Sequence, residues 1–207
     1  MTSCTGNIIK MNLALFDFDG TITTKDMFTG FIHFSTSKKR IFCARIILFP
    51  WLLLYKIGWY PAYKLRALVA FFAFKGKIFQ QVNILGEKYA QNIIPKFLCD
   101  HAMEKVKWHQ DNGDQVVVVS ASLDMYLRHW CEQHNLRLIC TDLEVKQEKL
   151  TGHFVAGDCS SAAKAQKISA QFILDDYDKI YAYGDTKEDF AMLALADEKY
   201  INWQEVD

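Results

Sequence analysis

Two aspartates, one residue apart, end the first apolar run of the chain. The segment LALFDFDGT, residues 13–21, places Asp17 and Asp19 just before Gly20. Side chains two positions apart on a strand point to one face, and glycine lets the backbone turn sharply. One carboxylate can attack phosphorus and form an aspartyl-phosphate, while the other protonates the leaving alcohol and later deprotonates water. The pair therefore indicates two-step chemistry on a phosphate ester.

Polar residues also end two later apolar runs. Ser120 closes VVVVS at 116–120, and Asp185 follows the run at 179–184. In open α/β sheets the carboxyl ends of the strands form the ligand site, so we expect Asp17, Ser120 and Asp185 to converge. A single carboxylate at a strand end is usually a turn or a helix cap. Three such ends favour a functional site.

The elements that must position these residues form an alternating pattern. Apolar runs at 13–17, 116–120, 137–141 and 179–184 predict buried parallel strands, and helical stretches are expected at about 122–135 and 160–172. This order predicts a doubly wound α/β sheet. We also expect a hairpin over 143–154 with Gly152 in or near its turn, a fifth strand at 200–202, and a solvated acidic loop at 175–178.

Roughly a hundred residues with helical spacing separate the first two strands, too many for a simple loop. We expect an inserted helical domain with breaks at Pro50, at 58–61, at Gly76 and at Pro95, and Pro61 and Pro95 suit first turns of helices. The expected division is a core at 1–23 and 106–207 and a helical cap at 24–105.

Residues 27–86 differ in composition from the rest of the chain. They contain no Asp or Glu, nine Lys or Arg, and 14 of the 29 aromatic residues, although the whole chain has a formal net charge of zero. The longest apolar run, residues 46–55, is too short to span a bilayer. The basic and aromatic segment therefore behaves as a separate module.

The termini and cysteines indicate a cytosolic protein. The first twelve residues lack the pattern of a signal peptide, and we expect residues 1–10 to be dispensable. Six cysteines lie far apart without a CxxC pair, and the six histidines make no metal-ligand spacing with them. Reduced thiols and a cytoplasmic location follow.

Four motifs in order resemble the haloacid dehalogenase (HAD) superfamily. They are DFDGT at 17–21, the serine that ends VVVVS, Lys164 at the opening of a helix, and GDTKED at 184–189. The resemblance implies a Rossmann-like core with a helical cap inserted after the first motif. It also implies Mg²⁺ as cofactor and a phosphorylated substrate as partner.

The resemblance implies a role for each matching residue. Asp17 would be the nucleophile, Asp19 the general acid and base, and Lys164 the cation that offsets negative charge at Asp17 and the phosphoryl group. Thr21 and Ser120 would hydrogen-bond phosphate oxygens.

The same resemblance implies a Mg²⁺ site. Its ligands would be the Asp17 side chain, the Asp19 backbone carbonyl and Asp185, and Asp189 would support these ligands from behind them or through water.

The second aspartate favours phosphomonoester hydrolysis, with a mutase as an alternative. The branch containing phosphoserine phosphatase is similar, and Asp26 stands where that enzyme has a Glu that reads the substrate ammonium, although GDTKED differs from its GDGxND. The sequence also resembles the phosphatidylglycerophosphatase C family in DMF at 26–28, LFPWLLLYKIGW at 48–59 and DTKEDFAML.

The cap composition gives a physical reason to consider a lipid. Interfacial helices set Lys and Arg against anionic headgroups, with Trp and Tyr at the boundary. The basic residues are Lys38, Lys39, Arg40, Arg45, Lys56, Lys64 and Arg66, and the aromatic ones are Trp51, Tyr55, Trp59, Tyr60 and Tyr63. The alternative is a cap that buries its aromatic residues in its own core.

The sequence therefore predicts a Mg²⁺-dependent phosphatase acting on a lipid phosphate such as phosphatidylglycerophosphate, peripheral on the inner face of an anionic membrane. The alternative is a soluble phosphoserine phosphatase-like enzyme for a small metabolite. A catalytically dead phosphate- or nucleic-acid-binding protein would not need Asp17, Asp19, Lys164, Asp185 and Asp189 together, so no nucleic acid is expected.

Overall fold

Parallel strands form the centre of the molecule in a computed structural model that describes residues 11–206. The six-stranded sheet has the order β3-β2-β1-β6-β7-β8. Its strands are β1 (Leu13–Phe16), β2 (Gln115–Leu123), β3 (Arg137–Thr141), β6 (Ile180–Gly184), β7 (Glu198–Ile201) and β8 (Gln204–Val206). Only the β7–β8 pairing in this sheet is antiparallel. The expected dispensability of residues 1–10 lies outside the described residues.

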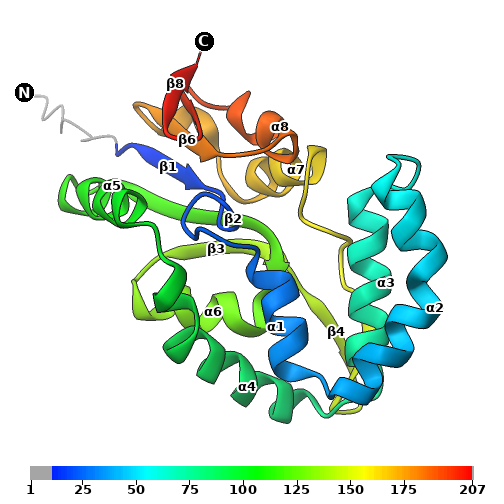
Figure 1. Cartoon of the computed structure of the whole chain (residues 1–207). Helices are drawn as coiled ribbons and strands as arrows, with labels where there is room; N and C mark the ends of the chain where they lie inside the picture. The colour runs from blue at the N-terminus through cyan, green and yellow to red at the C-terminus, as the bar shows by residue number, and fades with distance from the viewer. Residues whose placement is uncertain (1–10, 207) are drawn as a thin grey trace, which may run out of the picture.

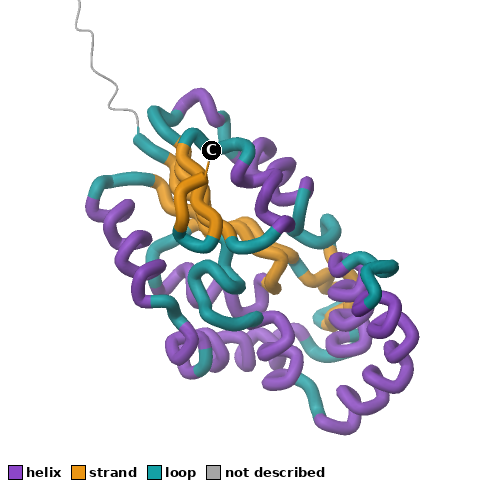
Figure 2. Tube along the Cα trace, turned by 45° about the horizontal axis from the view of Figure 1, so that its top comes forward, coloured by secondary structure: helices purple, strands orange, loops and turns teal. Residues whose placement is uncertain are grey.

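Helices cover both faces of the sheet, as Figure 2 shows. Alternate residues of β1 enter different layers: Phe16 packs in a cluster with residues of α5 (Asp100–Asp111) and α6 (Asp124–Gln133). Leu15 packs with residues of α7 (Ala162–Gln171) and α8 (Phe190–Leu193). The period of two along a strand buries both faces of a parallel sheet. The predicted doubly wound α/β fold is confirmed.

The long insertion between β1 and β2 is helical. It contains α1 (Met27–Ser35), α2 (Lys38–Lys56), α3 (Ala62–Phe74), α4 (Phe79–Asn92) and the short 3₁₀ helix η1 (Ile94–Phe97). In Figure 1, α4 lies against α6, whereas α2 and α3 run side by side away from the sheet. The division into core and cap stays a prediction, and its boundary at 105/106 falls inside α5.

The prolines of the insertion have different outcomes. Pro61 is the N-cap residue of α3 and Pro95 lies in the first turn of η1, as expected. The predicted break at Pro50 is wrong, because α2 continues through this residue. Proline lacks only its own N–H donor and disfavours the turn before it, and the surrounding run of good helix formers outweighs that cost.

The predicted hairpin consists of β4 (Leu143–Lys146) and β5 (Lys149–Phe154). Its turn is at Gln147 and Glu148, which have φ of 48° and 61°, and Gly152, expected in or near the turn, lies further along the chain. Gly152 lies within β5, where an added Cβ would approach the Phe71 Cα to 2.8 Å. The glycine lets β5 lie directly on α3.

Two further strands have limits that differ from the predicted ones. The fifth strand begins at Glu198 rather than at residue 200, and β8 follows it. β2 runs past Ser120 to Leu123, with a register shift against β3 after Val119. The acidic residues at 175–178 are exposed and precede β6, as expected.

Gly86 sets the distance between α4 and α6. An added Cβ would lie 1.8 Å from the backbone oxygen of Met125. We expect Gly86→Ala to lower the free energy of unfolding by about 1–3 kcal/mol, the usual cost of overpacking. Urea denaturation followed by circular dichroism measures it. Gln81→Ala, at an exposed position of the same helix, is the control, and equal midpoints for the two variants would contradict the prediction.

Candidate active site

The three central strands deliver polar side chains to one edge of the sheet. Asp17 follows β1, Asp185 follows β6, and Ser120 lies in β2. The strands are neighbours in the order β2-β1-β6, with Phe16 opposite both Val118 and Tyr183. These side chains lie together because parallel strands end at the same edge.

A buried lysine connects two of the carboxylates. Lys164, in the first turn of α7, donates from Nζ to Oδ1 of Asp17 and, at 2.6 Å, to Oδ1 of Asp189. Burial disfavours the ammonium, but the attraction of Asp17 and Asp189 outweighs burial and raises the pKa of Lys164. The lysine therefore stays charged beside Asp17.

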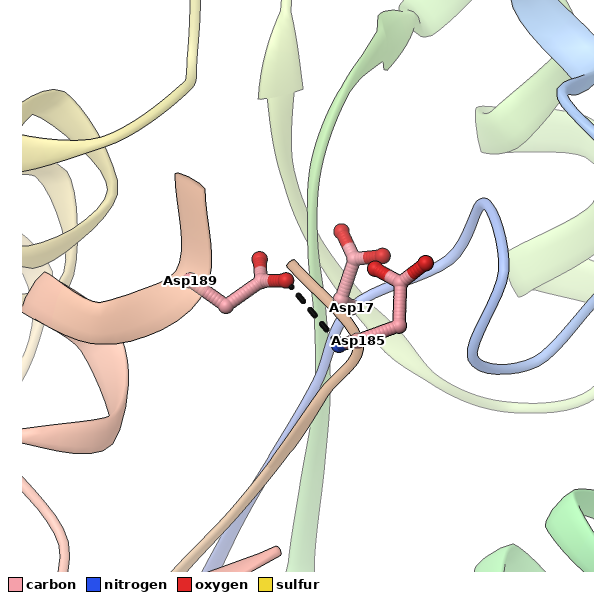
Figure 3. Close-up of side chains that lie close together, drawn as sticks. All are labelled: Asp17, Asp185 and Asp189. Carbon is pink, nitrogen blue, oxygen red and sulfur yellow. Dashed lines mark hydrogen bonds between the residues drawn. The ribbon is translucent and has the colours of Figure 1, made fainter. Parts of the chain in front are cut away.

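Asp189 organises the loop after β6. Its Oδ2 accepts hydrogen bonds from the backbone N–H groups of Asp185 at 3.1 Å and Thr186 at 3.0 Å. Burial alone would raise the pKa of Asp189, but Lys164 and these backbone donors lower it below the usual value. An ionised Asp189 thus fixes the backbone that carries Asp185, as Figure 3 shows.

Three carboxylates form a group that fits a metal ion. One oxygen from each of Asp17, Asp185 and Asp189 lies within 4.8 Å of the others (Figure 3). Burial, followed by the charge of Asp189, raises the pKa of Asp185 to about 6, and burial raises that of Asp17 to about 8. Lys164 pairs with only two of these three carboxylates, Asp17 and Asp189. An oxygen-only donor set with excess negative charge suits a hard divalent cation such as Mg²⁺.

Gly20 gives Asp185 the room to approach. Its φ is +88°, and an added Cβ would lie 2.0 Å from Oδ2 of Asp185. The glycine of the DFDGT motif is therefore required both by the left-handed backbone and by the closeness of the carboxylate.

Asp19 is held by a residue that the sequence analysis missed. Its Oδ1 accepts from the backbone N–H of Met27 at 2.6 Å, and its Oδ2 accepts from the hydroxyl of Ser122. Burial raises the pKa of Asp19 to about 7, so its carboxyl group can give and take a proton near neutral pH. The available signal was the SAS spacing, since Ser120 and Ser122 stand two positions apart on β2.

Asp26 and Thr21 are two of the residues predicted to bind substrate. Asp26 caps α1 by accepting from the backbone N–H of Thr29 at 3.1 Å and from its hydroxyl at 2.6 Å, and it lines the site cavity. The Thr21 hydroxyl is buried and has no hydrogen-bond partner among the described residues. Thr21 is not among the residues that line this cavity, and its contact with a phosphate stays a prediction.

A cavity of about 790 Å³ extends from the carboxylates into the cap. Asp17, Asp19, Ser120, Lys164 and Asp185 line one end. Helices α1, α2 and α3 line the other end with mainly apolar side chains, among them Ile32, Ile41, Leu48, Leu52, Leu65 and Val69. The arrangement combines a charged reaction centre with an apolar chamber.

Arg66 joins the cap to the loops of the reaction centre. From α3 it contacts Asp158 through Nε at 2.7 Å and Glu188 through Nη2 at 2.9 Å. Asp158 precedes α7, which carries Lys164, and Glu188 is the neighbour of Asp189. Arg40 is also engaged, donating to the backbone oxygens of Phe72 and Lys75. Internal contacts therefore occupy both arginines, which the sequence analysis had grouped with the exposed lysines.

Comparison with known proteins identifies the class of protein. The sequence pattern of the haloacid dehalogenase-like hydrolases matches residues 14–194. The chain belongs to this family. Residues from each of the four motifs, among them Asp17, Ser120, Lys164 and Asp185, line one cavity. It is an enzyme of the hydrolase class.

The individual proteins that resemble this chain have low sequence identity to it. Protein CicA of Caulobacter vibrioides is 28% identical over 193 residues, which cover 90% of this chain and 84% of CicA. A protein of unknown function from Bordetella pertussis Tohama I has a similar structure, with a TM-score of 0.72, 18% identity and coverage of 93% and 90%. A substrate-bound phosphoserine phosphatase has a TM-score of 0.62, 20% identity and coverage of 92% and 85%. The two structures share the fold of this chain.

The ion pair between Arg66 and Asp158 should contribute measurably to stability. Arg66 is only 20% exposed and Asp158 4%, so the pair is weakly screened by solvent. We expect a double-mutant cycle with Arg66→Ala and Asp158→Ala to give a coupling of about 1–3 kcal/mol in the free energy of unfolding. The exposed pair of Lys146 and Glu144 is the control and should couple more weakly, because solvent screens it. Additive effects at Arg66 and Asp158 would contradict the inferred connection between cap and core.

Proposed function

We propose that this protein is a Mg²⁺-dependent phosphomonoester hydrolase that works through an aspartyl-phosphate. An oxygen of Asp17 attacks phosphorus, the bond to the alcohol oxygen breaks, and Asp19 protonates the departing alcohol. Asp19 then takes a proton from water, which attacks the phosphorus and releases inorganic phosphate and the Asp17 carboxylate. The observation that supports the proposal best is the position of both carboxylates at one cavity, with Lys164 hydrogen-bonded to Asp17.

Asp17, Asp185 and the backbone carbonyl of Asp19 would hold Mg²⁺, and Asp189 would keep Asp185 in place. The ion would supply positive charge to a phosphoryl group that the carboxylates otherwise repel. The charge of Lys164, which is hydrogen-bonded to Asp17, acts in the same direction.

The substrate we propose is a lipid phosphate such as phosphatidylglycerophosphate. A small hydrophilic ester such as phosphoserine has no apolar group to cover the Ile, Leu, Val and Phe side chains that line the cap end of the cavity of about 790 Å³. An apolar alcohol moiety would bury this surface. The phosphoserine phosphatase among the structural neighbours makes a small metabolite the second candidate.

Replacement of the nucleophile tests the chemistry. We expect wild type with Mg²⁺ to hydrolyse p-nitrophenyl phosphate, and Asp17→Asn to lower kcat at least about a thousandfold, because the amide cannot form the acyl-phosphate. EDTA should abolish turnover and added Mg²⁺ restore it. Asp178→Asn, at an exposed position, is the matched control. An inactive wild type, or turnover by Asp17→Asn, would contradict the proposal and favour a phosphate-binding protein.

A second prediction concerns the apolar chamber. Ala44 lines the cavity, whereas the neighbouring Cys43 is exposed and does not. We expect wild type to have a higher kcat/KM for phosphatidylglycerophosphate in detergent micelles than for phosphoserine. Ala44→Phe should lower kcat/KM for the lipid about tenfold because the ring narrows the chamber. Cys43→Phe adds the same ring outside the chamber and is the control. Preference for phosphoserine would favour the soluble alternative.

A further inference from the structure

Helix α2 has two apolar faces instead of one. Ile41, Ala44, Leu48, Leu52 and Tyr55 recur every three or four residues, so they share one side of the helix, and they line the cavity. A second series recurs at the same spacing on another side. It consists of Phe42, Ile46, Phe49, Leu53 and Ile57, and we call it the outer stripe.

The outer stripe is exposed. Its five side chains are 52–65% exposed, and Leu48 is the only buried residue of the helix. Trp59, just beyond the end of α2, is 80% exposed and continues the apolar surface. A contiguous exposed stripe of large apolar side chains marks a surface that contacts something else. Figure 1 shows α2 at the periphery of the molecule, with α3 at its side and the six-stranded sheet remote from α2.

The charges near the stripe favour one occupant. Lys38, Lys39, Arg45 and Lys56 are exposed on α2, and no acidic residue occurs anywhere in residues 27–86. A second copy of this chain docked face to face would bring like charges together, with no carboxylate on either surface to offset them. Anionic lipid headgroups supply that missing charge, and the acyl region receives the apolar stripe.

The helix would lie along the membrane surface. Within the part of the chain that the structure describes, no helix combines the length and apolar character required of a membrane span. Exposed Trp and Tyr at one end of α2, such as Trp59 and Tyr63, suit the headgroup boundary.

We infer that the outer stripe of α2 is a membrane-binding surface for anionic bilayers, and that the same helix forms the wall of the catalytic cavity. The two faces of α2 would place the apolar chamber next to the lipid, so that a lipid phosphate reaches Asp17 without its apolar part crossing water. The delivery of substrate rests on the proposed function, whereas the binding of membrane does not.

Vesicle sedimentation tests the surface without any turnover. Wild type should bind vesicles of phosphatidylcholine and phosphatidylglycerol at low salt, bind pure phosphatidylcholine weakly, and detach in high salt. Phe42→Gln combined with Phe49→Gln should weaken binding at least about tenfold, because two aromatic side chains are lost from the contact. Lys38→Gln combined with Lys39→Gln should weaken binding to the anionic vesicles alone. Ile173→Gln removes an apolar side chain that is 70% exposed on the core and is the matched control.

Several results would overturn the inference. These are equal vesicle binding by the outer-stripe variant and Ile173→Gln, or no retention of wild type by anionic vesicles at low salt. Another is a concentration-dependent dimer in sedimentation analysis that the outer-stripe variant abolishes, with no vesicle binding. Circular dichroism confirms that each variant is folded. Vesicle binding by an inactive protein would leave the surface intact and refute the enzyme proposal, whereas hydrolysis in micelles without vesicle binding would do the reverse.

Discussion

The buried ammonium of Lys164 is the interaction on which the rest of the site depends. Burying a charge is costly unless it is paired and hydrogen-bonded. Lys164 meets this condition by donating to Asp17 and Asp189, which come from segments 147 and 25 residues away. Each carboxylate in turn would be costly to bury without the lysine. The three groups therefore require that β1, α7 and the loop after β6 assemble together.

A few contacts connect Lys164 and its two carboxylates to the surrounding segments. Asp189 holds the backbone of Asp185, and Gly20 leaves room for its carboxylate. Arg66, on helix α3 of the insertion, forms ion pairs with Asp158 and with Glu188, the neighbour of Asp189. The position of α3 is thus coupled to the segments that carry Lys164 and Asp189, and in the proposed reaction this coupling would help to keep water away from the phosphoryl group.

Helix α2 lies between the cavity of the candidate active site and the surface of the protein. A helix that is apolar on one side normally buries that side, but α2 lines a cavity with one face and exposes the other. Contacts within this chain therefore leave large apolar side chains of α2 exposed to solvent. A surface of this kind is consistent with a partner that offers both an apolar interior and negative charge, and such a partner would suit the absence of Asp and Glu from residues 27–86.

The sequence by itself determined the alternation of strands and helices, the helical character of the long insertion and the order of the family motifs, because burial periodicity and glycine or carboxylate placement are local signals. Only the tertiary structure decided which groups meet. Ser122 reaches Asp19 across 103 residues, and Arg66 reaches Glu188 across 122. The packing of Gly152 on α3 was also decided by a neighbour distant in the chain. Such contacts join residues that are distant in the sequence, so a local pattern of residues does not predict them.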